Sequence, residues 1–170
     1  MAKLKRNDPC FILKNASKYQ LEGCLIGEGW ESNGLANILI VRKNNETNKY
    51  LLGVLLVDTY CLGVKNVMFD VDVDKYLVDR LIEDLPYKMV EADYEYCRGL
   101  ILGAIDFARS VGFEPHDEWE DVKEFVEPDR EYKTKHKFGK KGKPFYIAGP
   151  DDDVDKIIEI LGGEVEIVLP

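Results

Sequence analysis

Hydrophobic, β-forming residues fill most of the chain from residue 36 to residue 73 and predict three short strands in quick succession. We expect these strands at 38–42, 51–59 and 66–73. The polar run 44–48 contains three asparagines and separates the first two strands. Asparagine tolerates a positive φ and bonds its own backbone, so this run is typical of a hairpin turn. The first two strands should therefore pair antiparallel.

The same pattern places two earlier strands at 11–13 and 21–26, followed by a glycine-rich loop over 27–34. Residues 1–9 are polar, and we expect them to be disordered. Residues 10–170 should form a single domain, because a chain of this length can bury a sizeable core in one unit.

Apolar residues alternate strictly with three aspartates over 69–74. Side chains two positions apart on a strand share a face, so the apolar face should be buried and the carboxylates solvated. From Lys75 the apolar residues recur at helical spacing instead, and Pro86 should end that helix.

The strongest helix is expected over 91–110, with Asp93 as its N-cap and Gly112 just past its end. Gly99 and Gly103 lie one turn apart inside this helix. Glycine costs about 1 kcal/mol relative to alanine in a helix interior. The pair therefore predicts that another backbone, in a sheet or a helix, packs closely against this point.

The remaining elements predict a short acidic helix at 118–126 and strands at 132–137 and 144–148. A helix over 151–161 and a final strand over 164–169 should follow. The predicted fold class is α+β, with an N-terminal antiparallel sheet, a long central helix and a C-terminal β-α-β tail.

Acidic residues outnumber basic ones by 32 to 23, which gives a net charge of −9. This charge disfavours general binding to nucleic acids or anionic membranes, which needs a positive surface, and it favours a basic protein as partner. No run approaches the roughly 20 apolar residues of a membrane span, and no secretory signal is recognisable. We therefore expect a cytoplasmic protein without a membrane partner.

The densest group of chemically capable side chains is Asp58, Cys61 and Lys65, near the end of the second strand of the group. A cysteine is nucleophilic when a neighbouring cation or base stabilises its thiolate. His116 could supply that base. These residues support a thiol hydrolase as one alternative function.

A second alternative uses carboxylates from separate elements, namely Asp58, Asp70 and Glu95. Converging acids hold Mg²⁺ in nucleases that cleave phosphodiesters with bound metal ions. Magnesium is a cofactor only under this hypothesis, and we expect no other cofactor. The four cysteines form no CxxC pair and the chain has only two histidines, so we expect no zinc site.

The only basic block of the chain lies within 133–143. Such a block can bind phosphate or an acidic patch of a partner. It can also be a solvated hairpin loop that pairs with the acidic segment 114–131. The six lysines are Lys133, Lys135, Lys137, Lys140, Lys141 and Lys143. The binding residues we expect are Lys137, Lys140, Lys141, Lys143 and, in the glycine-rich loop, Trp30.

Two segments, Leu-Val-Asp-Thr-Tyr-Cys-Leu-Gly-Val-Lys-Asn at 56–66 and Gly-Ala-Ile-Asp-Phe-Ala-Arg-Ser-Val-Gly-Phe-Glu-Pro-His at 103–116, resemble segments of a family of uncharacterised bacterial proteins. The resemblance spans about 34–161 and includes the lysine-rich run at 138–147. It implies a common fold and brings no named activity.

Together these patterns favour a binding module whose partner is a protein or a phosphate-bearing molecule. The two enzymatic alternatives, a metal-dependent nuclease and a thiol hydrolase, stay open at this point. A decisive question is whether Asp58, Cys61, Glu95 and His116 share one cleft.

Overall fold

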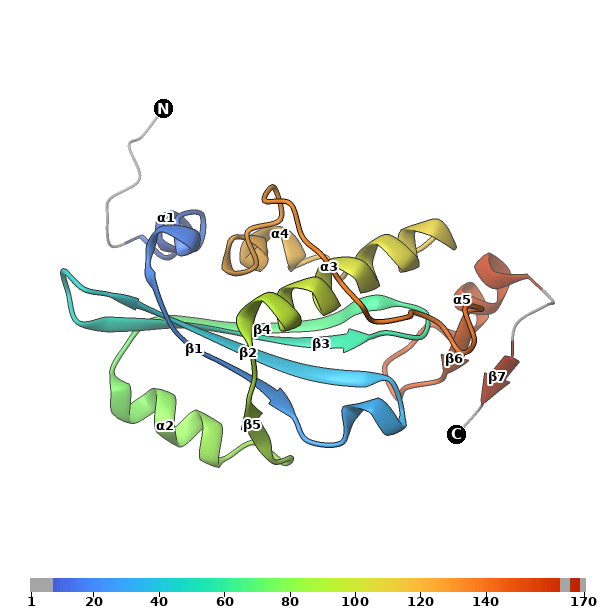
Figure 1. Cartoon of the computed structure of the whole chain (residues 1–170), viewed down its shortest axis with the longest axis horizontal. Coiled ribbons are helices and arrows are strands. Elements are labelled where there is room, and N and C mark those ends of the chain that lie inside the picture. The colour runs from blue at the N-terminus through green and yellow to red at the C-terminus, as the bar shows by residue number, and fades with distance from the viewer. Residues whose placement is uncertain (1–7, 163–165, 169–170) are drawn as a thin grey trace.

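Five antiparallel strands form one sheet in the spatial order β4-β3-β2-β1-β5 (Figure 1). The structure is a computed structural model that describes residues 8–162 and 166–168. The sheet packs with helices in the α+β architecture that the sequence predicts. The strands are β1 (Gln20–Gly27), β2 (Leu35–Asn44), β3 (Lys49–Asp58), β4 (Gly63–Val73) and β5 (Met89–Glu91).

The β2–β3 hairpin forms the centre of the sheet and confirms the predicted antiparallel pair. Its register runs from Leu35 opposite Asp58 to Asn44 opposite Lys49. Asn48 in the turn has φ 57°, a conformation that asparagine tolerates better than most residues. The polar run between the strands thus turns the chain as expected.

The alternation in β4 is broken by one extra residue. Between the Tyr50–Val73 and Leu52–Asp70 pairs, β4 contains one residue more than β3, and Asp72 in that interval has φ 60°. A bulge of one residue reverses the faces of the side chains beyond it. Val73 consequently packs beside α2 on the second face of the sheet, so the prediction of one uniform apolar face over 69–74 is wrong.

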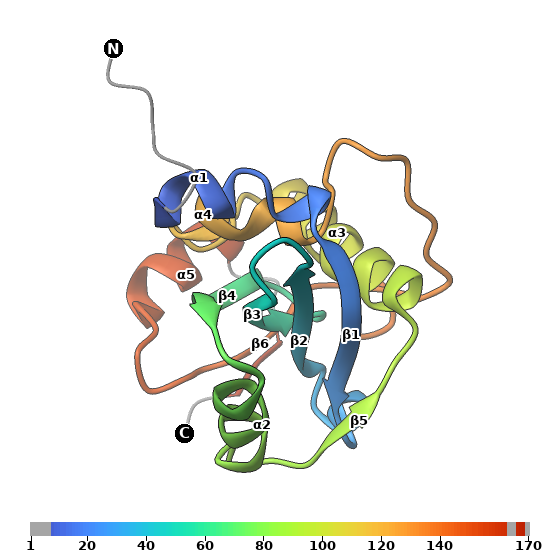
Figure 2. The ribbon, with the colours of Figure 1, turned by 90° about the vertical axis from the view of Figure 1, so that its left-hand side faces the viewer.

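Helices cover both faces of the sheet (Figures 1 and 2). Three of them, α1, α3 and α4, pack over one face and enclose the main core, and α2 lies on the other face beside a smaller core. The bounds are α1 (Pro9–Leu13), η1 (Ala16–Lys18), η2 (Trp30–Ser32), α2 (Lys75–Glu83), α3 (Tyr94–Ser110), α4 (Trp119–Val122) and η3 (Lys123–Phe125), where η marks a 3-10 turn.

The predicted first strand at 11–13 is wrong, because this segment belongs to α1. Asp8 caps that helix, accepting a hydrogen bond from the N–H of Cys10 at 2.9 Å, and Pro9 occupies the first helical position. An aspartate followed by proline is a typical helix start. Helix α1 therefore begins inside the stretch expected to be disordered, and residues 1–7 lie outside the described residues.

Helix α3 is the long central helix, and its N-cap and its last residue, Ser110, match the prediction. The predicted start at 91 is wrong, because Glu91 belongs to β5 and the helix begins at Tyr94. The side chain of Asp93 accepts a hydrogen bond from the N–H of Tyr96 at 2.8 Å. Gly112 follows the helix with φ 99°. The helix buries most of one face against the sheet, from Cys97 to Ala108.

The two helical glycines make room for another segment, as predicted, although that segment is neither sheet nor helix. A Cβ on Gly99 would overlap the carbonyl oxygen of Lys133. A Cβ on Gly103 would lie 2.5 Å from the ring of Phe138. Residues 133–138 therefore rest directly on the backbone of α3. They form no strand, so the predicted strand at 132–137 is wrong.

A fully buried arginine on α3 fixes the turn that leads into this segment. Arg98 donates hydrogen bonds to the carbonyl oxygens of Val126 and Glu127, each at 2.8 Å, and to that of Glu131 at 3.0 Å. It also donates to the carbonyl of Arg130. A buried guanidinium with this many acceptors holds the turn in one conformation.

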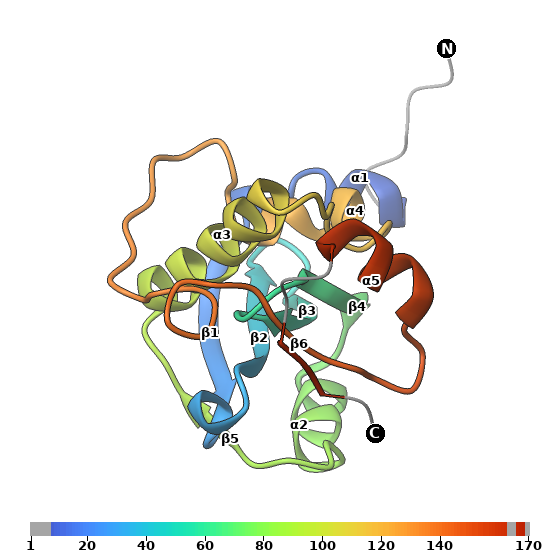
Figure 3. The same cartoon turned by 90° about the vertical axis from the view of Figure 1, so that its right-hand side faces the viewer.

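The C-terminal part forms the predicted β-α-β unit (Figure 3). Strands β6 (Phe145–Ile147) and β7 (Glu166–Val168) pair parallel, and α5 (Val154–Leu161) connects them. Among the described residues, no helix combines the length and the apolar character that crossing a membrane requires.

Candidate functional site

Asp58 closes the turn that follows β3. Its Oδ1 accepts hydrogen bonds from the N–H groups of Tyr60 at 2.8 Å and Cys61 at 3.1 Å. The residue is 4% exposed. Burial raises the pKa of its carboxyl above the usual value, against the opposing effect of the backbone donors and the Lys65 ammonium. Asp58 therefore acts as an internal cap of the turn.

Cys61 lies next to Asp58 but is fully buried. Burial, and then the charge of Asp58, raises the pKa of its thiol to about 12, so the thiolate that a hydrolase needs is disfavoured. His116 makes no hydrogen bond to Cys61. Its Nδ1 accepts the N–H of Glu118 at 3.2 Å. The predicted nucleophile and base are thus not arranged as a catalytic pair.

Lys65 does occupy a chemically distinctive position, with a partner that the sequence did not reveal. Its Nζ lies 2.8 Å from Oδ2 of Asp152, and both side chains are 12% exposed. The same oxygen accepts hydrogen bonds from the Tyr146 hydroxyl at 2.9 Å and the Gly149 N–H at 2.8 Å. Burial raises the pKa of the Asp152 carboxyl, but these donors outweigh it and leave that pKa lowered.

A cleft of about 250 Å³ opens beside this ion pair. Lys65 of β4, His116 of the loop after α3 and Lys156 of α5 all line it, so three separate parts of the chain converge there. Two of the five predicted catalytic residues, Lys65 and His116, therefore share a cleft. The loop Gly-Pro-Asp-Asp-Asp at 149–153, just before α5, is the sequence signal that could have added Asp152.

The three carboxylates proposed as magnesium ligands serve separate structural roles. Asp70 accepts the N–H of its neighbour Val71 at 2.9 Å, Asp58 caps its own turn, and Glu95 forms an ion pair with Arg130. Within the described residues, no group of three or more aspartate, glutamate, histidine or cysteine side chains could hold a metal ion. The structure does not bring this set together.

We define the lysine segment as residues 133–143. It is held in place by the preceding residue, Tyr132, and by the side chains of His136 and Phe138. The Tyr132 hydroxyl bonds Asp106 of α3. His136 and Phe138 are half-buried, and their rings lie 4.9 Å apart, edge to face. The segment crosses beside α3 and continues to the end of the sheet, where the N–H of Gly139 donates to the carbonyl oxygen of Thr59 at 2.9 Å (Figures 1 and 3).

The lysines of this segment face solvent. All six are exposed, and five of them form no ion pair among the described residues: Lys133, Lys135, Lys137, Lys141 and Lys143. The Nζ of Lys140 lies 3.7 Å from the ring centroid of Phe145. The acids of 114–131 that form ion pairs bind other residues, such as Arg109, Lys123 and Arg130. Among the described residues, the neighbouring acidic segment therefore forms no ion pair with these five lysines.

Trp30 supports the lysine segment from inside and is 5% exposed, which does not fit its predicted role as a contact residue. Its ring lies 5.3 Å from that of His136. Burial lowers the pKa of His136, although the charge of Glu31 opposes this effect. The Nε2 atom of His136 is buried and has no hydrogen-bond partner in the described part of the chain.

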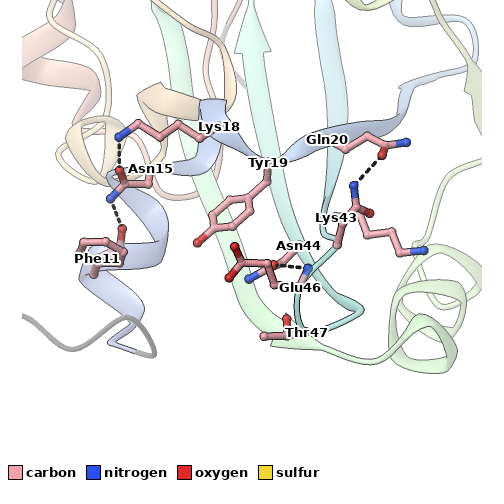
Figure 4. Close-up of a pocket in the computed structure, with 10 residues that line it drawn as sticks. Phe11, Asn15, Lys18, Tyr19, Gln20, Lys43, Asn44, Glu46 and Thr47 are labelled. Atoms are coloured by element: carbon pink, nitrogen blue, oxygen red, sulfur yellow. Dashed lines mark hydrogen bonds between the residues drawn. The ribbon is translucent and has the colours of Figure 1, made fainter.

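A larger cleft of about 420 Å³ lies at the hairpin end of the sheet (Figure 4). Its polar side chains bond one another: the Asn45 amide donates to Gln20 at 2.8 Å, and Lys18 donates to Asn15 at 2.7 Å. None of the predicted site residues lines this cleft.

Comparison of the chain with protein-family models, with curated proteins and with solved structures found no match.

Proposed function

We propose that this chain is a binding module whose lysine segment contacts an anionic partner, either an acidic protein surface or a phosphate-bearing molecule. One observation carries the proposal: five exposed lysines stand without ion pairs among the described residues, on a segment fixed to α3. Cations held on an anchored segment lose less conformational freedom on binding than those on a free loop.

The charge distribution limits what the partner can be. The lysine segment contributes +6, so the rest of the chain carries −9 − 6 = −15. A large polyanion such as duplex DNA would bring its own charge against this acidic body. The aromatic side chains of Trp30 and Phe138 are turned inward, so they provide no platform on which bases could stack. A short or localised anion fits the segment better.

The enzymatic alternatives have less support. The thiol of Cys61 is buried with a raised pKa, and the acids of the nuclease hypothesis serve separate turns and ion pairs. The lysine segment could bind an anion in the observed conformation, because its cations are already exposed.

Fluorescence anisotropy with two labelled probes, a short-chain polyphosphate and an oligoglutamate peptide, tests the proposal. We expect at least one probe to bind at low salt. Because ions compete for the lysines, binding should weaken by about tenfold as salt rises from about 50 mM to about 200 mM. The proposal fails if neither probe binds at low salt, or if binding is independent of salt.

A further inference from the structure

The cleft beside Lys65 holds donors that the fold does not use. The Lys65 ammonium has three hydrogens, yet within the described residues it makes one hydrogen bond, to Asp152. Lys156 of α5, which also lines the cleft, forms no ion pair in the described part of the chain. Two cations thus border the same space with unused donor capacity.

His116 adds a third donor. Its Nδ1 accepts the N–H of Glu118, so a neutral ring carries its proton on Nε2. The side chain is 35% exposed and lines the cleft. The backbone hydrogen bond holds Nδ1, so the Nε2–H group of His116 is available to a ligand.

Apolar side chains form the rest of the wall. Val64, Phe113 and Ile157 are buried, and Ile160 is exposed. A ligand in this space would therefore meet both cations and hydrocarbon. Such a combination recognises a small organic anion with an apolar body.

The balance of charge restricts that anion. Asp152, Asp153 and Glu114 also line the cleft and give it three carboxylates against two lysines. Asp152 pairs with Lys65, and Glu114 pairs with Arg109 at 2.9 Å. A doubly charged phosphate would be repelled by these acids more strongly than a singly charged carboxylate. The volume of about 250 Å³ also limits the ligand to a small molecule.

We propose that this cleft is a second binding site, separate from the lysine segment, for a small monocarboxylate with an apolar tail. The carboxylate lies between Lys65 and Lys156 with the His116 Nε2–H as a further donor. The tail contacts the apolar wall. This site shares no lining residue with the lysine segment, so each proposal can fail without the other.

The test uses four probes with one tail and different head groups: isovalerate, isopentyl alcohol, isopentylamine and isopentyl phosphate. Each is titrated into the ¹⁵N-labelled full chain, and amide shifts are followed by NMR. Isovalerate should bind with a dissociation constant of about 1 mM, tighter than the other three, and shift the amides around Lys65, His116 and Lys156.

Two variants locate the binding. Lys156→Gln should weaken isovalerate by about fivefold, whereas the matched surface control Lys88→Gln should leave it unchanged. Lys65→Met/Asp152→Asn removes the buried pair together, so it should fold and yet lose isovalerate binding. A stronger response to the amine or the phosphate, shifts spread elsewhere, no binding, or insensitivity to Lys156→Gln would overturn the proposal.

Discussion

The carbonyl oxygen of Lys133 occupies the space that a side chain on Gly99 would need. This contact joins the segment that carries the exposed lysines to the long helix in the core. A helix interior tolerates glycine at a cost of about 1 kcal/mol, and the close approach explains why two glycines stand there. The position of the lysines thus depends on the absence of a side chain on α3.

Gly99→Ala should lower the free energy of unfolding by about 1–3 kcal/mol, because the new methyl group must displace the Lys133 carbonyl. Gly23→Ala is the matched control, since a Cβ there meets nothing within 4 Å. Urea unfolding measures both, and trypsin should cleave after Lys133 or Lys135 faster in Gly99→Ala. Equal stability of the two variants would contradict the account.

Asp58→Asn should be tolerated, and Asp58→Ala should not. The asparagine oxygen can still accept from the N–H groups of Tyr60 and Cys61, whereas alanine leaves both donors without a partner, at about 1–3 kcal/mol. The pKa of Asp58 is raised on folding, so the native state holds this proton to higher pH than the unfolded state does. Ionisation of the Asp58 carboxyl therefore lowers the free energy of unfolding as pH rises above 3.8.

Urea unfolding of the wild type and Asp58→Asn between about pH 3.5 and pH 7 checks the sign. The stability of Asp58→Asn relative to the wild type should increase through that window and then level off. A relative stability that falls over the same range would show that the native carboxylate is favoured instead.

The Lys65–Asp152 pair should show strong coupling in a double-mutant cycle. Lys65→Met leaves a mostly buried carboxylate without its cation and should cost about 3 kcal/mol. Adding Asp152→Asn should recover most of that loss, because the asparagine oxygen still accepts from Tyr146 and Gly149. Additive losses in thermal or urea unfolding would mean that the pair contributes no specific interaction.

His136 should make the chain less stable in mild acid. Burial lowers its pKa in the folded state below the usual 6.5, so the unfolded state binds the proton more readily. Stability is full above 6.5 and falls as pH drops toward the lowered value. His136→Phe should remove this part of the pH dependence when unfolding is compared between about pH 5 and pH 8. Parallel pH profiles would contradict the prediction.

Local signals in the sequence predicted much of the fold. The hairpin at 44–48, the Asp93 cap of α3 and the β-α-β tail each follow from neighbouring residues, and each is present. The prediction of a strand at 11–13 was wrong because it relied on three consecutive apolar residues. The Asp8-Pro9 pair before them is a typical helix start and was the better guide.

The errors and omissions depend on distant contacts. Alternation over 132–137 is real, but that segment lies against a helix and not beside a strand, so it forms no ladder. Asp152 was missed because its partner Lys65 is 87 residues away along the chain. The bulge at Asp72 reverses a face that alternation alone cannot reveal.

The central claim is that an anchored row of lysines binds an anionic partner. The most direct test compares Lys133→Glu/Lys135→Glu/Lys137→Glu with a control that makes the same change in net charge elsewhere, Lys49→Glu/Lys75→Glu/Lys88→Glu. Both triple variants are titrated with the labelled polyphosphate and oligoglutamate probes by anisotropy. We expect the first variant to lose binding and the control to weaken it by about threefold or less. Equal losses in both variants, or retained binding in the first, would contradict the claim.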